Sequence, residues 1–227
     1  MLEPKPGMSA KKALRARARL ILFLTLAAWL KGDGLALAQD QSLASTPRST
    51  LWEAGVGEGF DKGAEEIGGS VGGGLGMRIL GSGHAHDWGL GVAQYGIMLS
   101  GVVATDHWYR GNVEFVAQLF GGEQFHPDTA YIVGMTPMLR YNFALGHRVV
   151  PFIDAGAGVT FTDIRDGDLS TTTEFNLQLG AGARFFMCDN LALTLQYRFI
   201  HLSNAGAASP NLGVNTGSLL LGLAWFF

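Results

Sequence analysis

The chain has 227 residues, of which 16 are Lys or Arg and 19 are Asp or Glu, and its formal net charge at pH 7 is −3. This acidic balance argues against nucleic acid as a partner, because proteins that bind phosphate backbones carry basic patches. Cys188 is the single cysteine, so the chain forms no internal disulfide. The 33 glycines, spread among short segments of alternating hydrophobicity, favour a tight β-barrel over a helical protein.

The first 38 residues have the pattern of a secretory signal peptide. Basic residues within 11–19 precede an apolar run at 20–30, and Ala36-Leu37-Ala38 offers the small residues of a cleavage site. An uncleaved anchor is the alternative, although the apolar run is short for a spanning helix. We expect the mature chain to begin at Gln39. Residues 39–69 are then an N-terminal segment, either periplasmic or forming a first strand.

Eight later segments alternate apolar and polar residues with the period of two that strands require. Where the pattern is clear, the odd-numbered residues form the apolar face, as in 173–187, where Phe175 and Leu177 alternate with Glu174 and Asn176. An apolar outer face with a polar interior is typical of a transmembrane barrel. The expected strands are 70–80, 88–100, 111–120, 129–143, 150–162, 173–187, 190–203 and 217–227.

An even number of antiparallel strands closes into a barrel with no free edge. We therefore expect an all-β fold, an antiparallel transmembrane β-barrel of eight strands over residues 70–227. A ninth candidate at 51–60 leaves ten strands as the alternative. Bacterial barrels have short periplasmic turns and longer external loops. The short connections 146–148 and 188–190 are thus expected to be periplasmic, and the longer ones at 121–128, 163–172 and 204–216 external.

Charged residues also fall on the inward face of the expected strands. The interior of a barrel of about eight strands is nearly filled by side chains, so these charges predict a buried ion-pair network and not a pore. The residues concerned are Glu114, Arg140, Asp154, Glu174, Arg184 and Arg198.

Two further motifs carry weaker signals. The glycine-rich stretch 68–76 lacks the Gly-Lys-Ser/Thr of a phosphate-binding loop, so we expect it to serve close packing in the barrel. His84 and His86 form an H-x-H pair in an expected external loop. A metal site needs further ligands, and we expect an ordinary polar loop there.

His201 and Ser203 lie two residues apart at the end of an expected strand, and so project to the same face about 6–7 Å apart. A serine hydroxyl is a poor nucleophile until a base removes its proton, and histidine is a suitable base. The parity places both residues in the lipid-facing row, at the external end of the strand. As an isolated tripeptide, H-x-S is weak evidence for catalysis, and it is more often two ordinary polar residues at the membrane interface.

The longer string H-L-S-N-A-G-x-x-x-P-N-x-G-x-N resembles the PagL-type lipid A 3-O-deacylases, a family of eight-stranded outer-membrane barrels. The likeness is strongest over 198–213. It implies that His201 is the base and Ser203 the nucleophile, and that Asn204 and Gly206 stabilise the oxyanion.

The same resemblance implies a reaction and a location. The substrate would be lipid A, the membrane anchor of lipopolysaccharide, and the reaction would hydrolyse the ester-linked acyl chain at position 3. The site would face the outer leaflet of the bacterial outer membrane, with membrane lipids as further partners. No metal and no organic cofactor are expected. The oligomeric state is left open, with a homodimer as one alternative.

Asn215 departs from the family, which has a glutamate at this position. An asparagine can hold a neutral imidazole by a hydrogen bond, but it offers no negative charge to a developing imidazolium. Glu174 and Asp154 have inward parity, and Asp163 lies two strands away. We therefore expect activity weaker than that of a glutamate enzyme. The alternatives are a catalytically silent barrel with an envelope-structural or binding role, and a phospholipase that uses the same residues.

Overall fold

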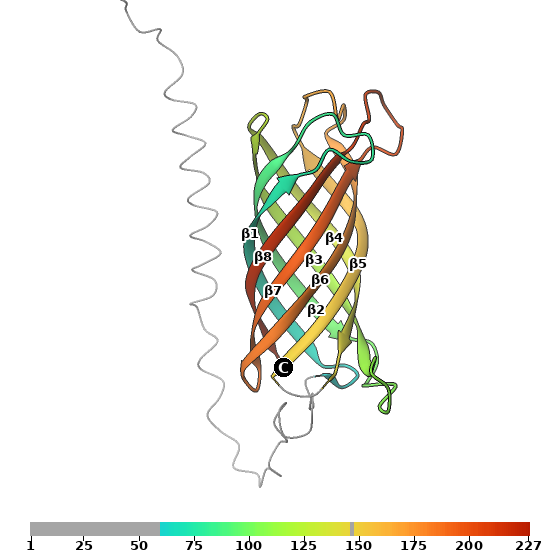
Figure 1. Cartoon of the computed structure of the whole chain (residues 1–227), viewed down its shortest axis with the longest axis vertical. Coiled ribbons are helices and arrows are strands. Elements are labelled where there is room, and N and C mark those ends of the chain that lie inside the picture. Colours follow the sequence, from blue (N-terminus) through green and yellow to red (C-terminus); the bar gives the residue numbers. More distant parts are fainter. Residues whose placement is uncertain (1–59, 146–147) are drawn as a thin grey trace, which may run out of the picture. The chain divides into compact units, whose positions relative to one another are not determined.

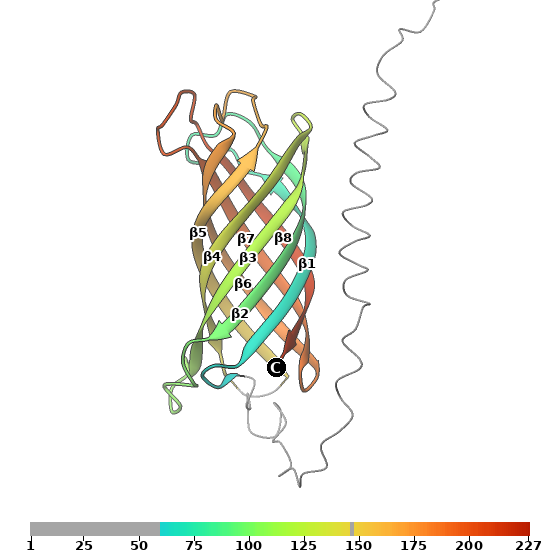
Figure 2. The same ribbon diagram turned by 180° about the vertical axis from the view of Figure 1, so that it is seen from behind.

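The computed structural model describes residues 60–145 and 148–227, and this part of the chain forms a closed antiparallel barrel of eight strands (Figure 1). Each strand pairs with its neighbours along the chain, and β8 closes onto β1; Figure 2 shows the opposite wall. The expected all-β fold class is thereby confirmed. The strands are β1 (Glu65–Gly76), β2 (Asp87–Met98), β3 (Gly111–His126), β4 (Ala130–Phe143), β5 (Val149–Thr162), β6 (Thr173–Cys188), β7 (Leu191–Ser203) and β8 (Val214–Phe226).

Several strand boundaries differ from the expectation, most of all in β1, β3 and β8. β8 begins at Val214, three residues before the expected strand at 217–227, so Asn215 lies within the strand and not in the expected loop at 204–216. β1 begins at Glu65, five residues before the expected strand at 70–80. β3 continues to His126, so the expected external loop at 121–128 was wrong, and only 127–129 separate β3 from β4. Gly121 and Gly122 interrupt the hydrophobic pattern but continue the pairing with β2. A Cβ on Gly122 would lie 2.0 Å from the Gly89 carbonyl oxygen, so close strand contact requires glycine here.

Several predictions fall on residues outside the described part of the chain. These are the signal peptide at 1–38, nearly all of the ninth candidate strand at 51–60, and two residues of the turn at 146–148. Phe60 is described and is fully buried, with its ring centroid 5.8 Å from that of Phe186 and 5.5 Å from that of Phe226. None of the described residues belongs to a helix long and apolar enough to span a membrane.

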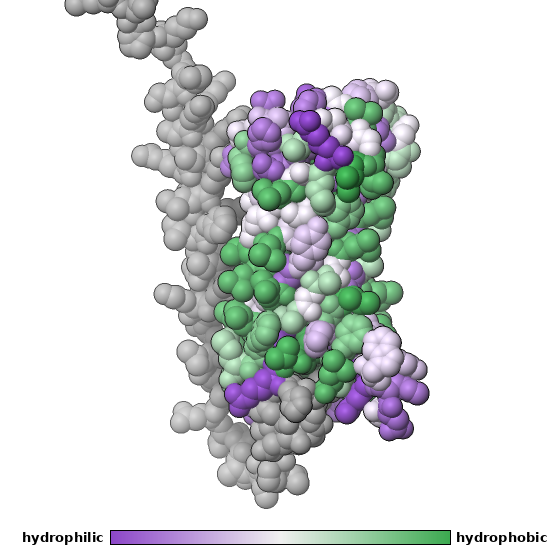
Figure 3. Space-filling view, in the orientation of Figure 1, coloured by the Kyte–Doolittle hydropathy of each residue, from purple (hydrophilic) through white to green (hydrophobic). Residues whose placement is uncertain are grey.

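The outward row of each strand is apolar, as the alternation predicts. Large side chains of this row are exposed, and the most exposed among them include Leu119, Leu139, Leu179 and Leu219 at 58–61%. Figure 3 shows this apolar surface around the middle of the barrel, with polar residues gathered at its two ends. This distribution matches the lipid-facing band of a membrane-spanning barrel.

The interior differs from the expected polar lumen, because buried apolar clusters also lie toward both of its ends. One apolar cluster fills the end near the 163–172 connection, and a second fills the opposite end around Phe60 and Phe226. The period-two pattern does not show this layering, since it averages over the length of each strand. The interior is therefore closed by apolar side chains at both ends.

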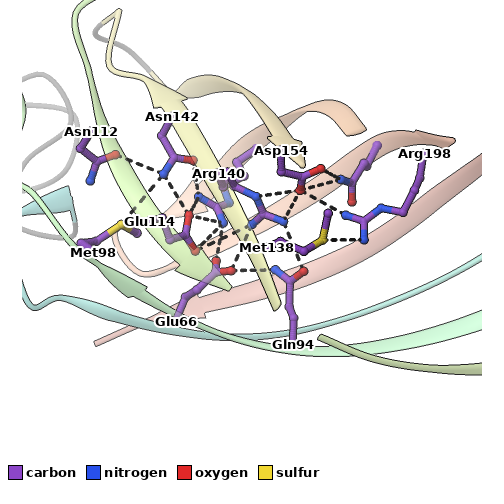
Figure 4. Close-up of polar contacts among 12 residues, drawn as sticks. Glu66, Gln94, Met98, Asn112, Glu114, Met138, Arg140, Asn142, Asp154 and Arg198 are labelled. Carbon is purple, nitrogen blue, oxygen red and sulfur yellow. Dashed lines mark hydrogen bonds and ion pairs between the residues drawn. The ribbon is translucent and has the colours of Figure 1, made fainter. Parts of the chain in front are cut away.

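Between these clusters lies the ion-pair network that the inward charges predict (Figure 4). Arg140 lies 2.9 Å from Asp154, and Arg184 lies 3.2 Å from Glu114 and 2.7 Å from Glu66. Glu66 was missed because the first strand was expected to begin at residue 70.

The network has a further cation and omits one expected carboxylate. Arg198 pairs with Asp154 at 3.1 Å. Glu174 does not belong to it, because its Oε1 accepts a hydrogen bond from Thr171 instead. Buried charges are costly unless paired, so each of these arginines and carboxylates depends on its partners across the interior.

The connections are divided between the two ends of the barrel. The segments 77–86, 127–129, 163–172 and 204–213 lie at one end, drawn at the top in Figure 1. The short turn at 189–190 lies at the other end, together with the longer connection 99–110. By the usual arrangement of bacterial barrels, the first end is external. The candidate residues lie where β7 and β8 reach that end.

Candidate active site at the external end of β7 and β8

His201 and Asn215 are directly opposite each other in the β7–β8 pair. Residues opposite each other in an antiparallel pair project to the same face, and the His201 Nδ1 atom lies 2.8 Å from Asn215 Oδ1. His201 is half-buried. Asn215 is fully buried, although it belongs to the outward-facing row of β8. The register of two strands thus brings together two candidate residues that are 14 positions apart in the sequence.

The segment 77–79 covers Asn215 and fixes its orientation. The side-chain Nδ2 of Asn215 donates a hydrogen bond to the Ile79 carbonyl at 2.7 Å, and its backbone carbonyl accepts from Met77 N at 2.8 Å. Because Nδ2 must face the carbonyl, Oδ1 faces the His201 ring as an acceptor. His201 Nδ1 therefore carries the proton, which leaves Nε2 as the basic nitrogen. Sequence reasoning missed Ile79, because it acts through a backbone carbonyl.

Ser203 is the last residue of β7 and is half-buried on the same face as His201. It pairs with Phe175 of β6. Within the described residues, the Ser203 hydroxyl makes no hydrogen bond, so the structure does not join it to His201 Nε2. A nucleophile and its base are often loosely placed until substrate binds. The two groups are nevertheless on one face and one strand, with only Leu202 between them.

Asn204 organises the turn that follows. Its backbone N–H donates to Asn211 Oδ1 at 3.0 Å, and its Oδ1 accepts from Gly206 N at 3.0 Å. Its Nδ2 donates to Ser170 Oγ at 3.3 Å and to the Ala208 carbonyl at 3.1 Å. The donors of Asn204 and Gly206, expected at an oxyanion site, are thus engaged within the described loops.

Ala205 differs from its neighbours in this turn. It has a φ of +54°, uncommon for a residue with a side chain. Its N–H makes no hydrogen bond with any of the described residues, whereas the flanking amides of Asn204 and Gly206 both donate. The turn therefore presents one free amide two residues after Ser203.

Gly213 also packs against the His201 ring. Its φ is +82°, and a Cβ at this position would lie 2.9 Å from His201 Cε1 and 3.3 Å from the Leu202 carbonyl. Both the backbone conformation and the space therefore require glycine. Gly213 N donates to the Asp168 carbonyl at 3.1 Å, which ties the 204–213 loop to the 163–172 loop.

Asp168 also binds the 77–86 loop through its side chain. The carboxylate is fully buried and accepts hydrogen bonds from Ser82 Oγ, from the backbone N–H of Gly83 and from His86 Nε2. Burial on its own would raise the pKa of the Asp168 carboxyl, but the hydrogen bonds from His86 and the 82–84 segment hold it below its ordinary value. Asp168 is thus an ionised carboxylate joining three external loops. No sequence motif pointed to this role for Asp168.

A family match and a curated relative point to the same family. Residues 74–224 match the family described as Lipid A 3-O-deacylase (PagL). The curated relative named Lipid A deacylase PagL, from Pseudomonas aeruginosa strain PAO1, is 38% identical over 90 residues, which are 38% of this chain and 49% of the relative. The chain thus aligns with about half the length of that relative.

Solved structures match over more of the barrel. The crystal structure of the outer membrane enzyme PagL has a TM-score of 0.52 and 21% identity, and the match covers 69% of this chain and 97% of that one. Neisserial surface protein A (NspA) has a TM-score of 0.53 and 15% identity over 73% of this chain and all of its own. At these identities the structures show the fold alone. The family match covers more than half of the sequence, and the chain therefore belongs to the PagL family of lipid A 3-O-deacylases.

Proposed function

We propose that this protein is a serine esterase of the bacterial outer membrane that removes the 3-O-linked acyl chain of lipid A. The observation that carries the proposal is the 2.8 Å contact between His201 Nδ1 and Asn215 Oδ1, on the lipid-facing row beside Ser203. This contact leaves His201 Nε2 available as a base for the hydroxyl of Ser203, two residues further along the same strand. The external end of the barrel lies at the level of the outer leaflet, where lipid A resides.

The proposed reaction has two halves. Ser203 Oγ attacks the ester carbonyl of the acyl chain while His201 Nε2 takes the hydroxyl proton. The tetrahedral intermediate collapses, the C–O bond to the sugar breaks, and His201 returns the proton to the sugar oxygen. Water, deprotonated by His201, then attacks the acyl-serine. The products are a free fatty acid and lipid A with a free 3-hydroxyl, and Ser203 regains its proton.

Asn215 acts on this reaction by orienting His201. In serine proteases, replacing the aspartate by asparagine lowers kcat by about 10⁴, largely because the imidazole takes the wrong tautomer. Here the Ile79 carbonyl fixes the amide so that the ring has the correct tautomer. What is absent is the charge that would stabilise the imidazolium. His201 is therefore a correctly oriented base in this proposal. The activation barrier of the reaction is higher than it would be with a carboxylate at position 215.

The oxyanion requires donors near Ser203. The family resemblance gives this role to Asn204 and Gly206. Their contacts support a role in shaping the turn, since the Gly206 N–H is occupied by Asn204 Oδ1. The free N–H of Ala205 is the donor that we assign to the oxyanion, with Asn204 and Gly206 holding the turn that presents it.

A catalytically silent barrel is the second candidate. It is favoured by the neutral Asn215 and by the lack of a hydrogen bond from Ser203 to any of the described residues. In that case the His201–Asn215 contact would only close the external end of β7 and β8. The two candidates make opposite predictions for lipid A in the same cells.

The test is mass spectrometry of lipid A and phospholipids from cells that express the chain, the Ser203→Ala variant or the Ser209→Ala variant. Ser209 is an exposed serine of the same loop and serves as the matched control. We expect the parent and Ser209→Ala to lose the mass of one 3-linked hydroxyacyl chain, and Ser203→Ala to keep it. Unchanged lipids in all three would favour the silent barrel. Deacylated phospholipids with intact lipid A would identify a phospholipase instead.

A further inference from the structure

A second group of polar residues lies in the external loops, outside the proposed catalytic residues. His84 of the 77–86 loop meets Asp166 and Asp168 of the 163–172 loop, and one potential ligand atom from each lies within 4.8 Å of the others. His84 Nδ1 lies 3.6 Å from Asp168 Oδ2. The three residues come from two loops that are about 80 positions apart in the sequence, so the H-x-H pattern alone gave no sign of the carboxylates.

One oxygen in this group is buried without a hydrogen bond. The Asp166 side chain is 7% exposed, and its Oδ2 atom has no hydrogen-bond partner. Its Oδ1 accepts from the backbone N–H of Asp168 at 3.2 Å. His86 Nδ1 lies 3.4 Å from Oδ2, but that nitrogen lies closer, at 2.8 Å, to Gln124 Oε1. A buried carboxylate oxygen without a partner is costly, and a cation beside it would remove the cost.

We propose that His84, Asp166 and Asp168 bind a divalent cation of the Zn²⁺ type. Zn²⁺ binds both imidazole nitrogen and carboxylate oxygen, and the two carboxylates balance its charge. The His84 side chain is 46% exposed, so the ion can enter from the external solvent. Three protein ligands leave a coordination position open to water.

The surroundings are built to hold the ligands in place. Gly83 N donates to Asp168 Oδ1 at 2.9 Å, and Ser82 Oγ donates to Asp168 Oδ2 at 3.1 Å. Such outer contacts orient metal ligands and tune their affinity. Asp168 also accepts from Gly213 N through its carbonyl. The cation would thus fasten the loops that meet beside His201, although its binding does not depend on the proposed reaction.

Titration calorimetry of the full chain without a histidine tag tests the proposal. The parent carries Ser203→Ala, so that no turnover contributes to the heat, and it is titrated in detergent with ZnCl₂ and separately with CaCl₂. The test variants are His84→Ala and Asp166→Asn. The matched controls are His126→Ala and Asp128→Asn, which alter exposed residues at the same end of the barrel.

We expect a single Zn²⁺ site in the parent and at least about tenfold weaker binding in both test variants. Both controls should stay within about twofold of the parent. Asp168→Asn is not used, because it would also release the 82–84 segment. His84→Ala keeps the backbone hydrogen bond from residue 84 to Asp168, so this variant should fold. Electrophoresis of the unheated protein checks this, because a folded variant has the same mobility as the parent.

Three results would overturn the proposal. The first is the lack of saturable Zn²⁺ binding at about 1 mM. The second is equal affinity in the parent and both test variants. The third is binding of Ca²⁺ at least as tight as that of Zn²⁺ and unaffected by His84→Ala, which would remove the imidazole from the ligand set. Each result stands whether or not the wild-type chain hydrolyses lipid A.

Discussion

Replacing Asn215 with aspartate isolates the effect of the missing charge, because the two side chains have nearly the same shape. Asn215 Oδ1 accepts from His201 Nδ1 at 2.8 Å, and Nδ2 donates to the Ile79 carbonyl at 2.7 Å. Aspartate keeps an acceptor toward the ring, but it turns the second contact into two oxygens facing each other. The substitution should therefore favour the reaction and disfavour folding.

The two effects have different sizes. Opposite charges about 4 Å apart attract by about 4 kcal/mol at an effective dielectric constant of about 20. If His201 is fully charged in the transition state, this gain corresponds to about a 10³-fold increase in kcat, as an upper limit. The lost hydrogen bond leaves the Ile79 carbonyl without its donor, at a cost of about 1–3 kcal/mol in folding free energy. We expect Asn215→Asp to raise kcat by about 10- to 10³-fold and to unfold at a lower urea concentration.

The assay measures release of 3-hydroxy fatty acid from lipid A in detergent micelles, with urea unfolding in parallel. Asn190→Asp is the matched control, because it adds the same charge at the opposite end of the barrel. A tenfold or larger decrease in kcat for folded Asn215→Asp would refute the reasoning. An equal increase in both variants would also refute it, since the effect would then belong to net charge.

Three other predictions follow from the contacts. Gly213→Ala should lower kcat at least about tenfold and destabilise the barrel by about 1–3 kcal/mol, because its Cβ would displace the His201 ring. Acyl release measures the change in kcat, and urea unfolding measures the change in stability. Leu179→Arg in the apolar belt should cost about 2–4 kcal/mol in bilayer refolding, whereas Leu212→Arg in an external loop should cost about 0–1 kcal/mol, and equal costs would contradict the membrane assignment. Arg184→Met should destabilise the barrel by about 3–5 kcal/mol in the same refolding assay, since it leaves two buried carboxylates short of a partner; no change would contradict the ion-pair network.

The strands could be predicted because each presents one face to lipid, and a one-residue error would reverse every side chain. The end of β3 was predicted wrongly because Gly121 and Gly122 interrupt the alternation of apolar and polar side chains. A residue without a side chain shows no preference for either face of the sheet. Prediction also missed Glu66, a charge inside an unrecognised strand end. The apolar clusters at both ends of the interior were missed for a different reason, because layering along the barrel axis is set by strand tilt and stagger.

The candidate site was predictable in part. The sequence places His201 and Ser203 on one face, and the family pattern selected Asn215, which the β8 register sets opposite His201. The contributions of Ile79 and Asp168 were not predictable, because both depend on loops that meet only in the folded barrel. Backbone carbonyls carry no sequence signature. The carboxylates beside His84 were also not predictable, because the 77–86 and 163–172 loops meet only in the folded barrel.

The closed interior of the barrel determines how the proposed reaction would meet its substrate. Apolar clusters at both ends and the ion pairs between them fill the interior, so a substrate would reach the site along the outer wall of the barrel. A lipid would arrive by lateral diffusion in the leaflet, and the released fatty acid would leave the same way. The relevant concentration is then a mole fraction in a two-dimensional fluid. Diluting the substrate with inert detergent should slow the reaction even when the amount of lipid A per millilitre is unchanged.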